Sequence, residues 1–400
     1  MSKYCTRCLN QDPAWFGNDH GTLYCRRCIS FGRLDLGDQD PVPSLKKIRW
    51  NGSPRLKFEL TDFQKNISAQ ALNALRSGRN VFIFASAGAG KTEISLQSIS
   101  WYLNQGLHVG FAISRRQVVI EIAERLQEYF PDLKVSAVCE GYPKNPADRY
   151  DSDLIVCTMH QLYRYPNCFD LLIMDEVDAF PYAGNEMLKA IADRACRGQK
   201  MLLSATPDDD VMEQIEQGKM ELCELFVRPH KKPLCVPRVR KGNRLFQVLM
   251  ILAECRTLIR QNKQILVFVP RRADGWWMKA LLSLAGSCGL IHSEIGGKDA
   301  IMNRFRSRQT RILVSTTLLE RGITVPSVQV LIYRADHPVF TCASLVQIFG
   351  RVGRTFDDPE GIGICYCERR SDAIKSCVSM IEKMNRTLYE ILQAERMNHE

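Results

Sequence analysis

The segment Val81–Thr92 reads VFIFASAGAGKT, and it sets the fold expected for the chain. It begins with an apolar run, VFIFA, continues through a loop with two glycines, and opens into the helix-like stretch EISLQSISWYLNQG. A strand buried on both faces reads as a continuous apolar run. A glycine-rich turn between such a strand and a helix exposes backbone N–H groups that bind anions. The segment therefore predicts a parallel α/β sheet with a phosphate-binding loop.

The loop residues have separable roles. Lys91 is expected to reach the β- and γ-phosphates of ATP, and the Thr92 hydroxyl to ligate Mg²⁺. Gly88 and Gly90 permit the close approach of backbone to phosphate. A chance glycine-rich turn is the alternative, and the strand before and the helix after argue against it. The nucleotide-binding residues expected here are Ser86, Ala87, Gly88, Ala89, Gly90, Lys91 and Thr92.

Short apolar runs recur on both sides of a basic stretch. In the first half they lie at 81–85, 109–113, 154–158, 171–176 and 201–206, and in the second at 265–270, 289–293, 312–317, 330–333 and 363–367, before a helix-like tail at 371–396. Such runs alternating with helical patterns indicate parallel sheets covered by helices. We therefore expect two tandem α/β domains. The expected boundaries are 1–35 for a metal-binding module, 36–56 for a linker, 57–227 for domain 1, 228–244 for a basic linker and 245–400 for domain 2.

Composition limits the class of protein. The chain has 400 residues, of which 45% are hydrophobic and 24% charged, so a multidomain globular protein is expected. The net charge of +10 favours a polyanionic partner, nucleic acid first, although mild basicity without a specific partner is the alternative. No apolar run is long enough to cross a bilayer, and the first residues lack a signal-peptide core. We expect a cytoplasmic protein that touches the inner face of a membrane peripherally at most.

Four of the sixteen cysteines form a distinctive pattern. Cys5 and Cys8 make one C-x2-C hook, and Cys25 and Cys28 make a second after sixteen intervening residues. Two such hooks supply the four thiolates of a tetrahedral structural Zn²⁺ site. Two disulfides or four unrelated thiols are the alternative, disfavoured by the spacing. The other twelve cysteines are expected to be small buried hydrophobic residues.

An acidic motif ends one of the apolar runs. The stretch LLIMDEVD, 171–178, places Asp175 at the end of a strand to hold Mg²⁺, and Glu176 to polarise the attacking water. A polar loop with solvated acids is the alternative. Asp178 is assigned a coupling role only as a hypothesis. Gln64 could hydrogen-bond adenine, and an ordinary surface-helix glutamine is an equally good interpretation.

Two arginines mark the second half. Gln347–Arg354 reads QIFGRVGR, and Arg351 and Arg354 are expected on one face of a helix-like segment. Guanidinium groups clamp phosphate oxygens and the charge of a phosphoryl-transfer transition state. An ordinary basic helix is the alternative. Together with the phosphate loop, the pair predicts that domain closure gates hydrolysis.

These motifs together resemble those of superfamily 2 helicases, in the same order and over roughly residues 57–370. The tetracysteine module, LTDFQ at 60–64 and MDEVDAFPY at 174–182 resemble more closely the ComFA family of late-competence ATPases. The motifs that carry the first resemblance are Ala85–Thr92, Asp175–Asp178, Ser204–Thr206, Thr316–Thr317 with Glu320–Gly322, and Gln347–Arg354.

The resemblance implies two RecA-like domains, ATP hydrolysis and contact with the phosphodiester backbone. It implies a catalytic set of Lys91, Asp175, Glu176, Arg351 and Arg354, with Gly322 also at the nucleotide. Ser204 and Thr206 would link the nucleotide state to the strand-binding groove. Ordinary turn residues are the alternative for the backbone contacts, which are Arg115, Arg116 and Thr158 in domain 1 and Thr316 and Thr317 in domain 2.

The function implied is an ATP-driven motor on single-stranded DNA that draws transforming DNA into the cytoplasm. Its implied partners are a membrane DNA channel, a phosphoribosyltransferase-like competence protein and a DNA-loading factor. Polarity, duplex unwinding, oligomeric state and the contacts of the zinc module remain open. A primosome-type replication-restart helicase is the alternative, although its zinc cysteines usually lie within the second half. A DNA-binding module with a decayed motor is disfavoured by the intact ATPase residues.

Overall fold

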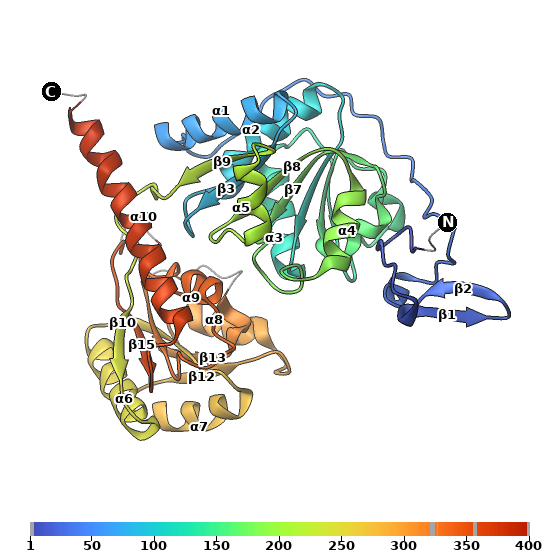
Figure 1. Cartoon of the computed structure of the whole chain (residues 1–400). Helices are drawn as coiled ribbons and strands as arrows, with labels where there is room; N and C mark the ends of the chain where they lie inside the picture. Colours follow the sequence, from blue (N-terminus) through green and yellow to red (C-terminus); the bar gives the residue numbers. More distant parts are fainter. Residues whose placement is uncertain (1–3, 321–324, 326, 355–357, 398–400) are drawn as a thin grey trace. The chain divides into compact units, whose positions relative to one another are not determined.

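The structure is a computed structural model, and it describes residues 4–320, 325, 327–354 and 358–397 (Figure 1). The chain forms two compact units. The first contains residues 1–85 and 91–225, and the second contains residues 86–90 and 226–400. Each unit is built on a parallel sheet, which confirms the α/β fold class expected from the apolar runs.

The first unit is built on a seven-stranded sheet in the order β5-β6-β4-β7-β8-β3-β9, with every pairing parallel. The central strands are buried along nearly their whole length, as continuous apolar runs require. The strands are β3 (Asn80–Ala85), β4 (Val109–Ile113), β5 (Val135–Val138), β6 (Leu154–Thr158), β7 (Phe169–Asp175), β8 (Cys196–Ser204) and β9 (Met220–Leu225).

One helix of this unit shows clearly how a single face is buried. In α3 (Arg116–Tyr129) the buried residues include Val119, Ile122, Ala123 and Leu126, which recur at the spacing of one helix face. The other helices are α1 (Asp62–Arg76), α2 (Lys91–Asn104), α4 (Glu186–Ala195) and α5 (Asp209–Glu216), with short 3-10 turns η3 (Pro146–Arg149) and η4 (Met159–Arg164).

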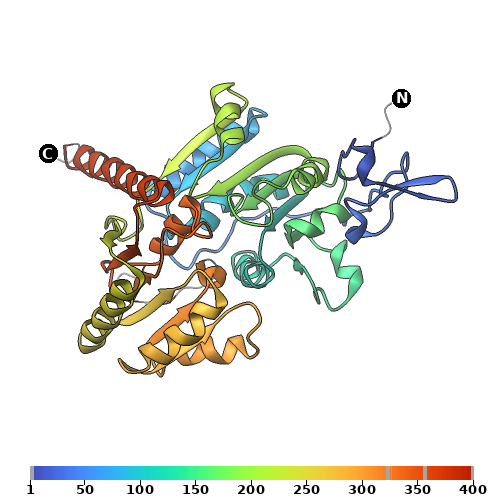
Figure 2. The ribbon, with the colours of Figure 1, turned by 60° about the horizontal axis from the view of Figure 1, so that its bottom comes forward.

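The N-terminal cysteine module belongs to the first unit. It contains η1 (Pro13–Trp15), the antiparallel hairpin β1 (Phe16–Asp19) and β2 (Thr22–Cys25), and η2 (Ile29–Phe31). The Arg194 side chain of α4 donates to the Thr6 carbonyl, and the Phe31 ring stacks on Tyr163 with centroids 4.9 Å apart. Figure 1 shows the module, in dark blue, beside α4, and Figure 2 shows it from a second direction. The module therefore packs against the α/β part of the first unit.

The second unit has a six-stranded parallel sheet in the order β10-β15-β14-β11-β13-β12. Its strands are β10 (Arg238–Lys241), β11 (Gln264–Phe268), β12 (Cys288–Ile291), β13 (Ile312–Ser315), β14 (Val328–Ile332) and β15 (Gly363–Cys367). Its helices are α6 (Arg244–Arg260), α7 (Arg272–Leu282), α8 (Lys298–Arg306), α9 (Cys342–Phe349) and α10 (Asp372–Met397), with the 3-10 turn η5 (Thr317–Glu320).

The basic segment 228–244, expected to be a linker, contains one short strand. Arg238–Lys241 form β10, an edge strand that pairs with β15. An edge strand has a neighbour on one side only, so the exposed Arg238, Arg240 and Lys241 are tolerated there. Among the described residues, no helix is both long and apolar enough to cross a membrane.

Candidate active site

Three strand ends meet at the carboxyl edge of the first sheet. β8 lies between β3 and β7, and the register pairs Phe84 with Ser204 and Leu203 with Asp175. The loops that follow these strands therefore leave the sheet side by side. Ligands of open parallel sheets bind at this edge.

The phosphate loop joins β3 to α2, as the sequence predicts. Gly88 and Gly90 have φ angles of 85° and 87°, a left-handed backbone that favours glycine. Lys91 is the first residue of α2, and Thr92 is buried in the first turn. The helix N-terminus, with its unsatisfied N–H groups, adds to the attraction for phosphate.

Asp175 and Glu176 stand at the end of β7. Oδ1 of Asp175 accepts a 2.8 Å hydrogen bond from the Glu176 backbone N–H, which also lies 3.0 Å from the Leu203 carbonyl. Glu176 has a φ of 57°, an uncommon conformation for a residue with a side chain. This turn ends the alternation of side chains along the strand directly after Asp175. The carboxylates of Asp175 and Glu176 can therefore both lie at the carboxyl edge of the sheet.

The loops after β7 and β8 are tied together. The Thr206 hydroxyl donates to Oδ2 of Asp178 at 2.7 Å, and Ser204 closes a local turn by donating to the Thr206 carbonyl at 2.8 Å. Asp178 thus has a specific partner. The coupling role assigned to it remains a prediction, and this contact gives it a physical basis.

The first-unit residues expected to contact nucleic acid lie on the other half of the same edge. Ile113, the last residue of β4, pairs with both Thr158 and Asp175. Arg115 and Arg116 follow β4. The Arg116 Nε donates to the Glu140 carbonyl at 2.7 Å, so this side chain is already oriented.

The second-unit threonines also follow a strand end. Thr316 comes directly after β13, and Thr317 begins η5. Gly322 lies outside the described residues.

The two arginines are not on one helix face, so that expectation is wrong. α9 ends at Phe349, and Arg351 and Arg354 lie in the turn beyond it. Gly353 has a φ of 64°, and an added Cβ would come 2.1 Å from the Pro359 carbonyl oxygen. The helix therefore cannot continue through this glycine. Arg351 is buried, and Arg354 Nε donates to the Gly350 carbonyl at 2.9 Å.

Gln64 is buried at the start of α1, so the surface-glutamine alternative is wrong. Its Oε1 accepts a 2.9 Å hydrogen bond from the Thr61 backbone N–H, while the Gln64 N–H donates to the Thr61 hydroxyl. This reciprocal capping box stabilises the helix start. Adenine recognition by Gln64 stays a prediction.

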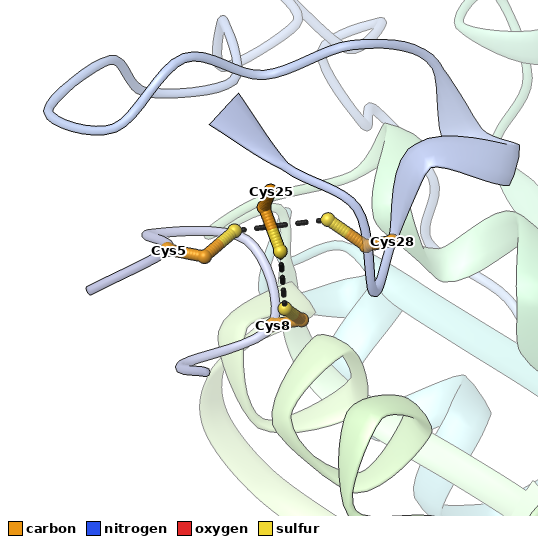
Figure 3. A group of neighbouring side chains, drawn as sticks. All are labelled: Cys5, Cys8, Cys25 and Cys28. Atoms are coloured by element: carbon orange, nitrogen blue, oxygen red, sulfur yellow. Dashed lines mark hydrogen bonds between the residues drawn. The ribbon is translucent and has the colours of Figure 1, made fainter. Parts of the chain in front are cut away.

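The four N-terminal cysteines converge in one buried cluster (Figure 3). Their sulfur atoms all lie within 4.8 Å of one another, and two pairs, Cys5–Cys28 and Cys8–Cys25, are 3.7 Å apart. Four thiolates at about 2.3 Å from a tetrahedral ion would be about 3.8 Å apart. The cluster therefore has the geometry to hold a metal ion. All four cysteines are free thiols in the structure, so the disulfide alternative is not supported.

Arg7 supports this cluster, although no motif in the sequence indicates this role. Its Nη1 donates to the Gly32 carbonyl at 2.7 Å and lies 3.9 Å from the Cys28 sulfur. The guanidinium also forms a two-pronged ion pair with Asp40 at 2.9 and 2.7 Å. A positive charge beside the thiolates offsets their repulsion. Its position inside the first hook was the only signal available in the sequence.

Two protein-family models match this chain. Residues 65–215 match the family model "DEAD/DEAH box helicase", and residues 245–356 match "Helicase conserved C-terminal domain". The chain is 31% identical to competence protein ComFA of Bacillus subtilis over an alignment of 412 residues, which covers 95% of this chain and 85% of that protein. The chain belongs to the ComFA family. Competence protein ComFA of Streptococcus pneumoniae is 30% identical, with 96% and 90% covered.

Membership of the ComFA family makes the protein an ATP-dependent ATPase of helicase superfamily 2, with ATP and Mg²⁺ as the family's cofactors. The fold agrees. Saccharomyces cerevisiae Dbp5 bound to RNA and ADP BeF3 superposes with a TM-score of 0.57 at 19% identity, over 81% of this chain and 87% of that one. The ComFA family is thus a competence-related family of helicases and translocases, and the two parallel-sheet units of this member are RecA-like.

Proposed function

We propose that this ComFA-family protein is an ATP-driven motor that moves along single-stranded DNA and draws transforming DNA into the cytoplasm. One observation carries the proposal. The carboxyl edge of the first sheet has Asp175 at its centre, the phosphate loop and Ser204 on one side, and Thr158 and Arg115 on the other. ATP chemistry and strand contact would therefore use neighbouring loops of one rigid sheet.

The nucleotide would be held by backbone N–H groups of residues 86–90 and by Lys91. Thr92 and Asp175 would hold Mg²⁺, which neutralises phosphate charge when bound. Glu176 would orient the attacking water and take its proton. Arg351 and Arg354 would stabilise the charge that develops on the transferred phosphoryl group.

The DNA contacts would read the backbone only. Arg115, Arg116 and Thr158 in the first unit, with Thr316 and Thr317 in the second, offer guanidinium and hydroxyl donors to phosphates. Such contacts position a strand without reading its bases, which suits a motor that must accept any sequence. The net charge of +10 supports a polyanionic track.

The tetracysteine cluster would hold one structural Zn²⁺. All four ligand positions would be filled by Cys5, Cys8, Cys25 and Cys28, so the ion would stabilise the module and take no part in hydrolysis. We further propose that the protein works at the inner face of the cell membrane, through a DNA channel, a phosphoribosyltransferase-like competence protein and a DNA-loading factor.

The decisive experiment is the steady-state ATPase rate at one fixed salt concentration, because phosphate contacts make binding steeply salt-dependent. The rate is measured alone and with single-stranded DNA, duplex DNA or single-stranded RNA. Stimulation by single-stranded DNA above the other two is expected. Equal or greater stimulation by RNA would overturn the proposal, and efficient unwinding of a tailed fork would favour a replication-restart helicase instead.

A further inference from the structure

Arg228, at the start of the basic segment 228–244, is a buried charge that the proposed chemistry does not use. Its side chain is 1% exposed and is among the largest fully buried side chains of the described residues. The guanidinium donates three hydrogen bonds to backbone carbonyls. Nη1 lies 3.0 Å from the Val352 oxygen and 2.7 Å from the Gly353 oxygen, and Nη2 lies 3.1 Å from the Gly350 oxygen.

His230 reinforces the same turn. Its Nε2 lies 3.0 Å from the Gly353 carbonyl, and its Nδ1 accepts a 3.2 Å hydrogen bond from the Lys232 backbone N–H. Burial and the Arg228 charge lower the pKa of His230. The imidazole is therefore neutral at physiological pH and carries its proton on Nε2, which donates to Gly353.

Arg228 occupies its site without a carboxylate partner among the residues that the structure describes. Burial, followed by the charge of Arg354, lowers the pKa of Arg228 to about 9. A buried cation paired only with carbonyls stabilises a fold less than an apolar side chain of the same size would. This arrangement therefore points to a task other than global stability.

The Gly350 carbonyl connects Arg228 to Arg354. Its carbonyl oxygen accepts from Arg228 Nη2 at 3.1 Å and from Arg354 Nε at 2.9 Å. The segment Gly350–Gly353 lies beyond the end of α9 at Phe349, and Gly353 has a left-handed backbone conformation. Backbone hydrogen bonds run from the Arg351 N–H to the Ile348 carbonyl at 3.2 Å and from the Val352 N–H to the Phe349 carbonyl at 3.0 Å. Arg228 adds three side-chain hydrogen bonds to the carbonyls of the same turn.

We propose that Arg228 is a positioning residue for ATP hydrolysis. It fixes the turn Gly350–Gly353 and, through the shared Gly350 carbonyl, sets the direction of Arg354. His230 assists by holding Gly353. The inference rests on the proposed role of Arg354 at the transferred phosphoryl group, and it gives the first residue of the basic segment a part in catalysis.

A double-mutant cycle on the full-length protein tests this inference. Arg228→Gln, Arg354→Gln and the double variant are compared for kcat and KM for ATP with single-stranded DNA. Arg228→Gln should lower kcat about tenfold or more, because hydrogen bonds from a charged donor are lost, and should change KM less. If Arg228 acts through Arg354, the double variant will be no slower than Arg354→Gln alone. Arg238→Gln, an exposed arginine of the same segment, is the matched control and should leave kcat unchanged.

The outcomes separate this inference from the function on which it rests. Multiplied losses in the double variant, or wild-type kcat in Arg228→Gln, would overturn the positioning role while leaving the motor intact. Full activity in Arg354→Gln would instead remove the proposed role of Arg354. If Arg228→Gln fails to fold, His230→Ala carries the test, with a several-fold loss of kcat expected that disappears in the Arg354→Gln background.

Discussion

The hydroxyl of Thr206 donates a 2.7 Å hydrogen bond to Oδ2 of Asp178 and thereby joins the loops that follow β8 and β7. Asp178 lies two residues beyond Glu176, the proposed base, so the bond connects the loop that carries the two proposed catalytic acids to the Ser204–Thr206 turn. We therefore expect a movement of either loop on nucleotide exchange to move the other. Because the partners belong to separate loops, this bond is the direct candidate for coupling ATP turnover to strand contact.

Thr206→Val should uncouple the two activities. The substitution keeps the shape of the side chain and removes the donor to a charged acceptor, an interaction worth about 1.5–3 kcal/mol. We expect roughly tenfold less stimulation of the ATPase by single-stranded DNA, with nucleotide affinity nearly unchanged. Titration of DNA at saturating ATP measures this effect. Thr257→Val, on the exposed face of α6, is the control, and equal stimulation in both variants would contradict the coupling role.

Glu176→Gln should separate nucleotide binding from hydrolysis. The amide cannot take a proton from water, so kcat is expected to fall by a factor of about 10² to 10⁴. ATP should still bind, because Lys91 and the phosphate loop are intact. A fluorescent ATP analogue and single-turnover hydrolysis measure the two steps. Glu216→Gln, at an exposed site in α5, is the control, and near-normal turnover in Glu176→Gln would remove the proposed base.

The central strands of the two parallel sheets could be predicted from the sequence, but three edge strands of these sheets could not. β3, β4, β6 and β7 are flanked on both sides and read as unbroken apolar runs. Those three strands are β5 and β9, which close the first sheet, and β10, which closes the second at the edge opposite the predicted β12. The hairpin strands β1 and β2 were not predicted either. An edge strand has one neighbour and buries fewer side chains, so sequences such as MELCEL and RVRK carry no continuous apolar signal.

The same distinction applies to the site. The phosphate loop, the acids after β7 and the two cysteine hooks are each contiguous in sequence, so their spacing alone predicts them. Arg7 and Arg228 act through backbone carbonyls that lie 25 and about 125 residues away. Contacts of that kind depend on the tertiary fold, so no local sequence pattern predicts them. The end of α9 at Phe349 was missed because arginine three residues from arginine also fits a helix.

Removal of two cysteine ligands should release the metal and loosen the N-terminal module. Cys5→Ser with Cys8→Ser leaves two thiolates, too few for a structural site. The zinc content measured by elemental analysis should fall from one ion per chain to none. In limited proteolysis, the first cleavage should occur within residues 1–40. Cys288→Ser, at a partly buried cysteine of the second unit, is the control. One zinc per chain in the double variant would show that the metal site lies elsewhere.

Asp170→Asn should destabilise the first unit in a way that depends on pH. Asp170 accepts from the His108 backbone N–H at 2.9 Å and from Arg197 through Nε and Nη2, both at 2.8 Å. Burial alone would raise the pKa of Asp170, but these hydrogen bonds outweigh it and hold the pKa below its ordinary value. The asparagine keeps one acceptor and loses the charge, so we expect a loss of about 2 kcal/mol at pH 7.

Because the folded-state pKa of Asp170 is depressed, its stabilisation is fully present above the unfolded-state pKa of about 3.9 and is lost as pH falls through the folded-state value. Urea unfolding midpoints of wild type and Asp170→Asn should therefore differ most at pH 7, and the gap should begin to narrow below about pH 4. Asp132→Asn, in an exposed ion pair with Arg55, is the control and should cost under about 1 kcal/mol. A gap that stays constant down to pH 3 would mean that Asp170 contributes through packing and not through its charge.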